Sequence, residues 1–156
     1  MIIECYIKED CLVRMKRHID KILDATYERG YVYNINYHLI WCTRYRRECF
    51  TSDDLIDEMK SIIFDISKMA NIEIKEIEVM SDYVHLLVSF KPKYSITDVV
   101  KNIKGYTARI FFDNHPEIKD NELWCGKLWS SSYYVGTVGN VSKETVQMYI
   151  RNQYKK

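Results

Sequence analysis

Glycine and proline are scarce in this sequence, with five Gly and two Pro among 156 residues. Collagen-like repeats and long disordered segments are therefore excluded, because both require a much larger share of these residues. The sequence also lacks an apolar run of the roughly 18 to 20 residues that a membrane-spanning helix needs. Its first ten residues, MIIECYIKED, show neither the basic nor the apolar region of a secretory signal. We therefore expect a folded cytoplasmic protein without a membrane partner.

The chain has almost no excess of charge of either sign. Lys and Arg number 23, Asp and Glu number 22, and the net charge is +1. Such a balance does not attract nucleic acid to the molecule as a whole, so any nucleic-acid binding has to depend on local basic groups.

No two of the five cysteines have a Cys-x-x-Cys spacing. A disulfide framework and a zinc ribbon are therefore not indicated, and we expect reduced thiols in structural positions. Aromatic residues, by contrast, are plentiful, with 13 Tyr, 5 Phe and 3 Trp. Such side chains can fill a core, stack on unpaired bases or, in the case of tyrosine, act as nucleophiles.

Hydrophobic residues recur with helical spacing in some segments and alternate in others. Helical spacing predicts helices over residues 10–29, from Thr51 or Ser52 to Met69, over 95–112, and from Ser142 toward the C-terminus. Alternation predicts strands over 31–42, 72–80 with a bulge near Glu76, 83–90 and about 133–138.

The order of these elements after residue 30 is strand, helix, strand, strand, helix, strand, helix. This order predicts an α+β fold, a ferredoxin-like split β-α-β arrangement with an antiparallel sheet, a C-terminal helix and an extra N-terminal helix. Such a fold packs its two main helices on one sheet face and leaves the other face free to bind a ligand. We predict an N-terminal helical extension over 1–30 and one domain over 31–156.

Among the four histidines, His85 stands out because it interrupts the apolar strand VHLLV. A buried imidazole needs a polar partner, so His85 is either a satisfied core histidine or part of a site. His38 either points outward from the first strand or faces a site. On the predicted last helix, Tyr149 and Gln153 are four residues apart and share one face. They either meet one target, or Tyr149 packs in the core while Gln153 is solvated.

Four ordered segments carry a family resemblance, and Tyr33–Arg47 (YNINYHLIWCTRYRR) supports it. The four are Ser81–Ser95 (SDYVHLLVSFKPKYS), Asn102–Phe112 (NIKGYTARIFF), Leu128–Ser142 (LWSSSYYVGTVGNVS) and Tyr149–Gln153 (YIRNQ). Together they resemble the small single-tyrosine HUH transposases, which comprise the TnpA-type proteins of compact insertion sequences and the REP-associated tyrosine transposases. The resemblance spans about residues 31 to 154.

In that family, a His-hydrophobic-His strand and a Gln of the last helix hold one divalent metal, and a Tyr one turn before that Gln attacks single-stranded DNA. The resemblance therefore implies Tyr149 as the nucleophile, His85 and Gln153 as metal ligands, and Mg²⁺ or Mn²⁺ as the cofactor. A phenol, with a pKa of about 10, attacks poorly unless the scissile phosphate is polarised, and a metal supplies that polarisation. The expected products are a 5′-phosphotyrosine and a free 3′-OH, which permit later rejoining without ATP.

Tyr83 stands where the family has its first metal-binding histidine. Positions 83 and 85 share one strand face, but a protonated phenol is a weak magnesium ligand. Three outcomes are open: Tyr83 binds the metal directly or through water, Asp82 or His38 replaces it, or the site binds hairpin DNA without cutting it. A rival from another class is an RNA-binding ferredoxin-like module that uses exposed aromatic residues.

Local basic groups are the candidate DNA contacts. They are Arg44, Arg46 and Arg47 after the first strand, Lys91 and Lys93 after residues 83–90, and Lys101, Lys104 and Arg109 on the helix over 95–112. Ordinary solvated charge explains each group equally well. The resemblance implies single-stranded DNA with hairpins as the ligand and a homodimer as the assembly. The stretch Gly136–Gly139 lacks a following Lys-Ser or Lys-Thr, so we reject a nucleotide-binding loop.

Overall fold

The computed structural model describes residues 25–120, 126–139, 147–148 and 150–152. The chain divides into two units, Met1–Asn34 and Ile35–Lys156. The described part of the first unit is a hairpin of β1 (Thr26–Glu28) and β2 (Tyr31–Tyr33), which pair antiparallel. The division of the chain into an extension over 1–30 and a domain over 31–156 stays a prediction.

Two of the predicted elements are wrong in part. The helix over 10–29 lies mostly outside the described residues, but its last part, Thr26–Glu28, is a strand. Gly30 does not end a helix: it has φ of 100° and forms the hairpin turn, because glycine adopts this left-handed conformation without a Cβ clash. The strand over 31–42 is interrupted at residues 34–36, and β2 pairs with β1 instead of continuing into the next strand.

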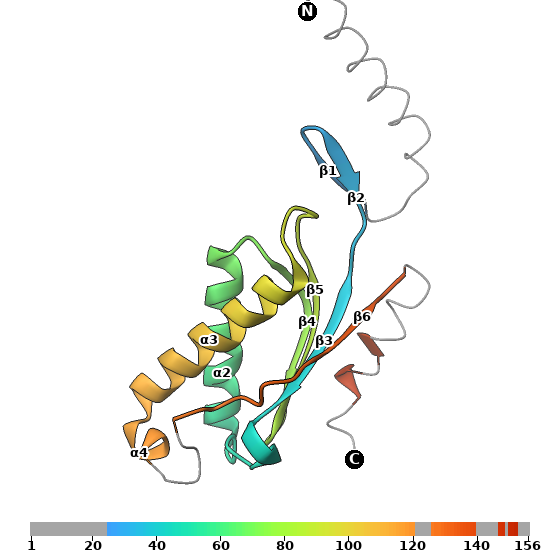
Figure 1. Ribbon diagram of the computed structural model, residues 1–156. Coiled ribbons are helices and arrows are strands. Elements are labelled where there is room, and N and C mark those ends of the chain that lie inside the picture. The colour runs from blue at the N-terminus through green and yellow to red at the C-terminus, as the bar shows by residue number, and fades with distance from the viewer. Residues whose placement is uncertain (1–24, 121–125, 140–146, 149, 153–156) are drawn as a thin grey trace, which may run out of the picture. The chain divides into compact units, whose positions relative to one another are not determined.

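The second unit contains a four-stranded antiparallel sheet covered on one face by two long helices (Figure 1). Its strands are β3 (Tyr37–Cys42), β4 (Glu73–Val79), β5 (Tyr83–Ser89) and β6 (Tyr134–Thr137), arranged in the order β4-β5-β3-β6. The helices are α2 (Asp53–Met69) and α3 (Ile96–Asn114), and two shorter elements are the 3-10 helix η1 (Arg44–Arg46) and α4 (Pro116–Lys119). The predicted α+β fold with an antiparallel sheet is confirmed.

The two long helices begin where the sequence predicted. The Ser52 hydroxyl accepts a hydrogen bond from the Leu55 N–H, and the Ser95 hydroxyl accepts one from the Asp98 N–H. Each serine therefore satisfies a backbone donor that the first helical turn leaves without an intrahelical partner. The predicted bulge is also present, as an irregularity of β4 between Ile74 and Glu76.

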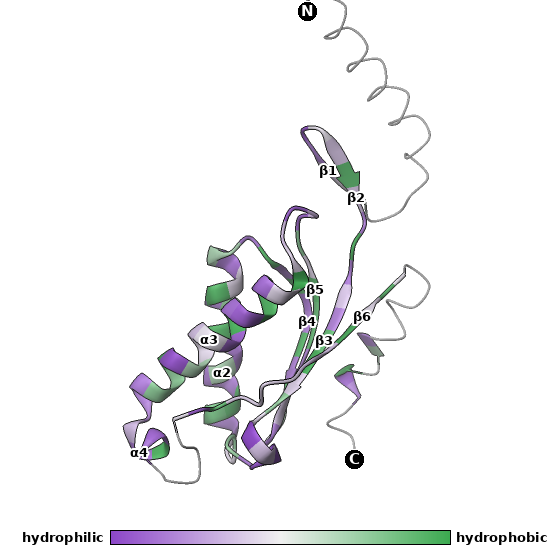
Figure 2. Ribbon diagram, viewed as in Figure 1, coloured by the Kyte–Doolittle hydropathy of each residue, from purple (hydrophilic) through white to green (hydrophobic). Residues whose placement is uncertain are grey.

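The core lies between the helices and one sheet face. Figure 2 shows hydrophobic and hydrophilic residues alternating along α2 and α3, as burial of a single helix face requires. Large side chains buried in this core include Leu39, Trp41, Phe50, Met59, Ile63, Leu86, Ile103 and Phe111. Burial raises the pKa of the Cys49 thiol to about 12, which fits the predicted structural, unreactive cysteine. Within the parts of the chain that the structure describes, no helix has the length and apolarity needed to cross a membrane.

A second, smaller hydrophobic cluster lies on the opposite sheet face. It consists of Leu87 from β5, Val138 after β6, and Ile150, whose neighbours 147, 148 and 151 are helical. Figure 1 shows this helical turn on the side of the sheet away from α2 and α3. The helix predicted from Ser142 begins outside the described residues, and its described part is helical. The C-terminal segment thus packs on the helix-free face.

Ile150→Ala should destabilise the protein by about 2 to 4 kcal/mol, because Ile150 is 1% exposed and its truncation leaves a cavity above Leu87. Met148, which is 62% exposed, provides the matched control, and Met148→Ala should change stability by less than about 0.5 kcal/mol. Urea unfolding measures both. Equal, small effects of the two substitutions would contradict packing of this segment on the sheet.

An ion pair joins α2 to the end of α3. His115 Nε2 lies 2.6 Å from Glu58 Oε2, and Asn114 donates a hydrogen bond to Glu58 Oε1. The hydrogen bond to Glu58 raises the pKa of His115 above its ordinary 6.5. Desolvation alone would raise the pKa of Glu58, but the hydrogen bonds from His115 and Asn114 outweigh it and lower that pKa.

His115→Gln should therefore cost more stability at about pH 6 than at about pH 8.5. A raised histidine pKa contributes stability that is fully present below the unfolded pKa and disappears as pH rises through the folded pKa. We expect a loss of up to about 1 kcal/mol at the lower pH and a smaller loss at the higher pH, measured by urea unfolding. The same loss at both values would show that the protonated imidazole does not stabilise the fold.

Candidate functional site

The helix-free face of the sheet holds the histidine that the sequence singled out. Along β5, Val84, Leu86 and Val88 are 0% exposed and belong to the main core. Because side chains alternate along a strand, Tyr83, His85 and Leu87 lie on the opposite face. His85 is buried, with 5% of its surface exposed, although it does not lie on the sheet face that packs against α2 and α3.

A second imidazole lies beside His85. His38 comes from β3, where it pairs with Leu87, and Ile40, two residues further along β3, pairs with His85. The His38 and His85 ring centroids are 5.4 Å apart and nearly perpendicular, and the Tyr83 ring is 5.0 Å from His85 on its other side. The structure thus resolves the two alternatives for His38: it faces His85.

Both imidazoles have pKa values below the ordinary 6.5, a shift that favours the neutral form. Burial, and after it the charge of His38, lowers the pKa of His85 to about 4, and burial lowers the pKa of His38. A neutral imidazole has one ring nitrogen free of a proton, which is the form that binds metals. Among the described residues, buried His38 Nε2 has no hydrogen-bond partner.

These donors fit a divalent cation in part. Two neutral imidazoles and a phenol gather on one face, but the described part of the chain holds no cluster of three His, Cys, Asp or Glu side chains that could bind a metal alone. A further ligand is needed from elsewhere. Tyr149 and Gln153, the nucleophile and ligand that the resemblance implies, lie outside the described residues.

The described residues next to Tyr149 nevertheless lie on this face. Ile150 packs with Leu87, the neighbour of His85 on the same side of β5. The Arg151 guanidinium donates a hydrogen bond to the carboxylate of Glu76 on β4. Sequence reasoning missed the Glu76–Arg151 pair, because its members are 75 residues apart and neither lies in a recognisable motif.

Asp82, named as an alternative metal ligand, is bound by an arginine. Its Oδ2 accepts a hydrogen bond from Arg46 Nε at 2.9 Å, and its backbone carbonyl accepts one from the Thr43 N–H. The Arg46 guanidinium carbon also lies 6.0 Å from the centroid of the Tyr83 ring. The basic turn after β3 is therefore fixed against the β4–β5 turn and lies next to Tyr83.

This basic turn presents an exposed aromatic ring close to two guanidinium groups. Tyr45 is 68% exposed, and its centroid is 4.9 Å from the guanidinium carbon of Arg44 and 5.1 Å from that of Arg47. Tyr45 and Arg46 both have positive φ, 57° and 54°, a conformation that costs a non-glycine residue about 1 to 3 kcal/mol. An exposed ring flanked by guanidinium groups can stack on an unpaired base and neutralise a phosphate.

The remaining predicted DNA contacts lie on other elements. Lys91 follows β5 at the end opposite Tyr83, and Arg109 is exposed on α3. Lys104, also on α3, donates hydrogen bonds to the Ser130 carbonyl at 2.7 Å and the Ser132 carbonyl at 3.0 Å. Lys91, Lys104 and Arg109 therefore come from other elements than the arginines of the basic turn.

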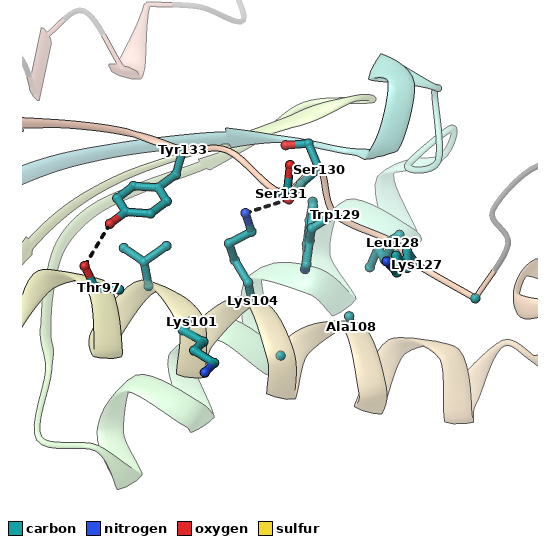
Figure 3. A pocket seen from close by; sticks show the side chains of 13 residues that line it. Thr97, Lys101, Lys104, Ala108, Lys127, Leu128, Trp129, Ser130, Ser131 and Tyr133 are labelled. Atoms are coloured by element: carbon teal, nitrogen blue, oxygen red, sulfur yellow. Dashed lines mark hydrogen bonds between the residues drawn. The ribbon is translucent and has the colours of Figure 1, made fainter.

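Lys104 lies beside a cavity of about 450 Å³ between α3 and residues 126–133 (Figure 3). Figure 3 shows its side chain reaching from the helix to the segment before β6, and a second bridge joins Thr97 to the Tyr133 hydroxyl at 3.3 Å. Lys104 thus fastens this segment to α3, a structural role that leaves its ammonium largely occupied.

Comparison with known proteins gives consistent matches. The family model described as transposase IS200-like matches residues 31–153. The ISDra2 transposase TnpA of Deinococcus radiodurans is 42% identical over 128 residues, which cover 82% of this chain and 90% of that protein. The transposase for insertion sequence element IS200 of Salmonella typhimurium is 29% identical over 126 residues, with 78% of each chain covered.

Solved structures agree with these matches. A Deinococcus radiodurans R1 protein described as a transposase has a TM-score of 0.69 at 43% identity, with 82% of this chain and 97% of that chain covered. A REP-associated tyrosine transposase bound to a REP hairpin has a TM-score of 0.56 at 14% identity, with 81% and 70% covered, a likeness of fold alone. The family model matches residues 31–153, and the match to the 42% identical relative covers 90% of that relative's length. This chain therefore belongs to the family of IS200-like transposases.

Proposed function

We propose that this transposase cuts and rejoins single-stranded DNA through a covalent bond to Tyr149, with a divalent metal held at His85. The observation that carries the proposal is the meeting of two parts of the chain on one sheet face. His85 and His38 lie there on neighbouring strands, and the helical turn that contains Ile150 and Arg151, the residues after Tyr149, packs on the same face.

The proposed reaction is a transesterification. The Tyr149 phenol loses its proton and its oxygen attacks the phosphorus, while the bond from phosphorus to the 3′ oxygen breaks. The 3′ oxygen takes up a proton and leaves as a free hydroxyl, and the DNA 5′ end stays bound to Tyr149 as a phosphotyrosine. Attack by a 3′-OH on this phosphotyrosine reverses the step, so rejoining requires no ATP.

His85 and Gln153 are the proposed ligands of Mg²⁺ or Mn²⁺, with Tyr83 left open by the resemblance. When bound, the cation would polarise the scissile phosphate and stabilise the charge that develops on it. His85 suits this role because its depressed pKa leaves the imidazole unprotonated near neutral pH. The side chains around it exclude water from this part of the face, since His85 and Leu87 are both buried.

The proposed substrate is single-stranded DNA that carries a hairpin. The REP-associated relative is bound to a REP hairpin, and the basic turn of this chain offers an exposed ring with two guanidinium groups close to it. The position of Arg46 against Tyr83 places this basic turn beside the proposed site. The homodimer that the resemblance implies stays a prediction.

A covalent adduct on Tyr149 tests the proposal. The full-length protein is incubated with Mg²⁺ or Mn²⁺ and single-stranded oligonucleotides that carry hairpins from the ends of the element, and peptides are then analysed by mass spectrometry. Wild-type protein should carry DNA on Tyr149, and Tyr149→Phe should carry none. Tyr94→Phe is a matched control, because Tyr94 lies on the loop before α3 and should leave adduct formation unchanged.

Other results separate the rival functions. Tight hairpin binding without an adduct, together with an adduct in Tyr83→His, would identify a catalytically degenerate DNA-binding protein. Stronger binding of RNA than of hairpin DNA, with no effect of Tyr149→Phe on any activity, would identify an RNA-binding module and contradict the proposal.

The basic turn should make the affinity for DNA dependent on salt. Replacing Arg44 and Arg47 by Gln removes two phosphate-neutralising groups, so the negative slope of log affinity against log salt should become shallower by about 1.4 for single-stranded DNA.

Lys104→Met should instead lower the free energy of unfolding by about 1 to 3 kcal/mol and leave the slope unchanged, because the Lys104 ammonium binds two backbone carbonyls. Filter binding at several salt concentrations measures the slope. If Lys104→Met changed the slope and the replacement of Arg44 and Arg47 did not, DNA would bind along α3 instead.

A further inference from the structure

We infer that His38, on the strand next to His85, supplies the second histidine ligand of the metal site, in place of the histidine that Tyr83 has replaced. This inference rests on the proposed function and deepens it, because it names a ligand from a different strand. In the family, both histidine ligands lie on one strand, whereas here one would come from β3 and the other from β5.

The pairing of the strands places His38 and His85 as diagonal neighbours. Ile40 is opposite His85 and His38 is opposite Leu87, so the two histidines are two positions apart in the ladder and lie on the same face. Their ring centroids are 5.4 Å apart. Long side chains in this diagonal relation can reach a common target. Nε2 of His38 is buried and, among the described residues, has no hydrogen-bond partner, so this nitrogen is available as a donor.

The C-terminal segment packs on the His38 side of His85. Ile150 packs in one hydrophobic cluster with Leu87, the residue opposite His38. Arg151 binds Glu76, which is the partner of Leu87 on β4. Both contacts of the segment thus fall on the row of residues that contains His38. The described residues of this segment therefore lie on the side of His85 where His38 lies.

Tyr83 lies on the other side of His85. It pairs with Cys42 at the end of the β3–β5 ladder, two residues along β5 from His85 and four from Leu87. There its ring is next to the Arg46 guanidinium, whose positive charge disfavours a cation nearby. Asp82, the other alternative, is already bound by Arg46. Of the three residues proposed to replace the missing histidine, His38 alone has both a nitrogen donor and a position beside the C-terminal segment.

Two imidazoles also change the preferred metal. Mg²⁺ strongly prefers oxygen ligands, whereas nitrogen ligands suit the first-row transition metals, including Mn²⁺. A site with His38 and His85 should therefore bind Mn²⁺ more tightly than Mg²⁺.

Mn²⁺ binding to the full-length protein tests the inference without reference to cleavage. The EPR signal of free Mn²⁺ gives the affinity of wild-type protein and of four variants, His38→Gln, His85→Gln, Tyr83→Phe and His115→Gln. We expect His38→Gln and His85→Gln each to weaken binding by at least about tenfold. Tyr83→Phe should change the affinity by less than about twofold, and the control His115→Gln, whose histidine pairs with Glu58, should bind as the wild type does.

The variants distinguish failure of the inference from failure of the proposed function. If His85→Gln weakens binding while His38→Gln does not, or if Tyr83→Phe weakens it instead, His38 is not the ligand. If His85→Gln binds Mn²⁺ as the wild type does, the metal site of the proposed function is itself wrong. Pulsed EPR of Mn²⁺ bound to wild-type protein counts the coordinated imidazoles directly and does not depend on the folding of His38→Gln. Two coordinated imidazoles support the inference and one overturns it.

Discussion

The alternation of side chains along β5 is the constraint on which the rest of the molecule depends. Val84, Leu86 and Val88 are fully buried beneath α2 and α3, so the register of this strand is fixed by its hydrophobic residues. A shift of one residue would turn the His85 imidazole into an apolar core and expose three aliphatic side chains. The same constraint that builds the core therefore holds His85 on the helix-free face, where a site can form.

The second hydrophobic cluster lies on the same face and includes a residue from near the end of the chain. Leu87 and Val138 provide an apolar surface on the helix-free face, and Ile150 covers it. The contact is small, but it decides where the segment after Tyr149 lies, and the Glu76–Arg151 pair adds a polar contact beside it. Hydrophobic packing thus brings together residues that are far apart in the sequence, and the proposed chemistry depends on that meeting.

Local signals in the sequence predicted what local interactions determine. The starts of α2 and α3 follow from Ser52 and Ser95, whose hydroxyls bind backbone N–H groups within one turn, and the irregular pairing near Glu76 was visible as a slip in the alternation. The family was also identified correctly from ordered motifs. The β1–β2 hairpin was missed because the helical spacing of residues 10–29 continues up to Gly30, and only pairing with Tyr31–Tyr33 distinguishes a strand there.

What the sequence could not predict depends on register between distant strands. The sequence allows two orientations of His38, because only the pairing of β3 with β5 makes His85 its neighbour. Lys104 was grouped with DNA contacts by its charge, but its partners are backbone carbonyls of Ser130 and Ser132, which carry no signal in side-chain pattern. Arg151 likewise has no motif of its own, and its role follows only from its hydrogen bond to Glu76 on β4.

The central claim is that a metal-dependent active site lies on the helix-free face of the sheet. Anomalous diffraction at the manganese absorption edge, from crystals of the full-length protein with Mn²⁺ and hairpin DNA, tests it most directly. The account predicts an anomalous peak bonded to His85 on that face, next to the C-terminal segment. A protein that binds the DNA but shows its manganese peak elsewhere, or shows none, would contradict the account.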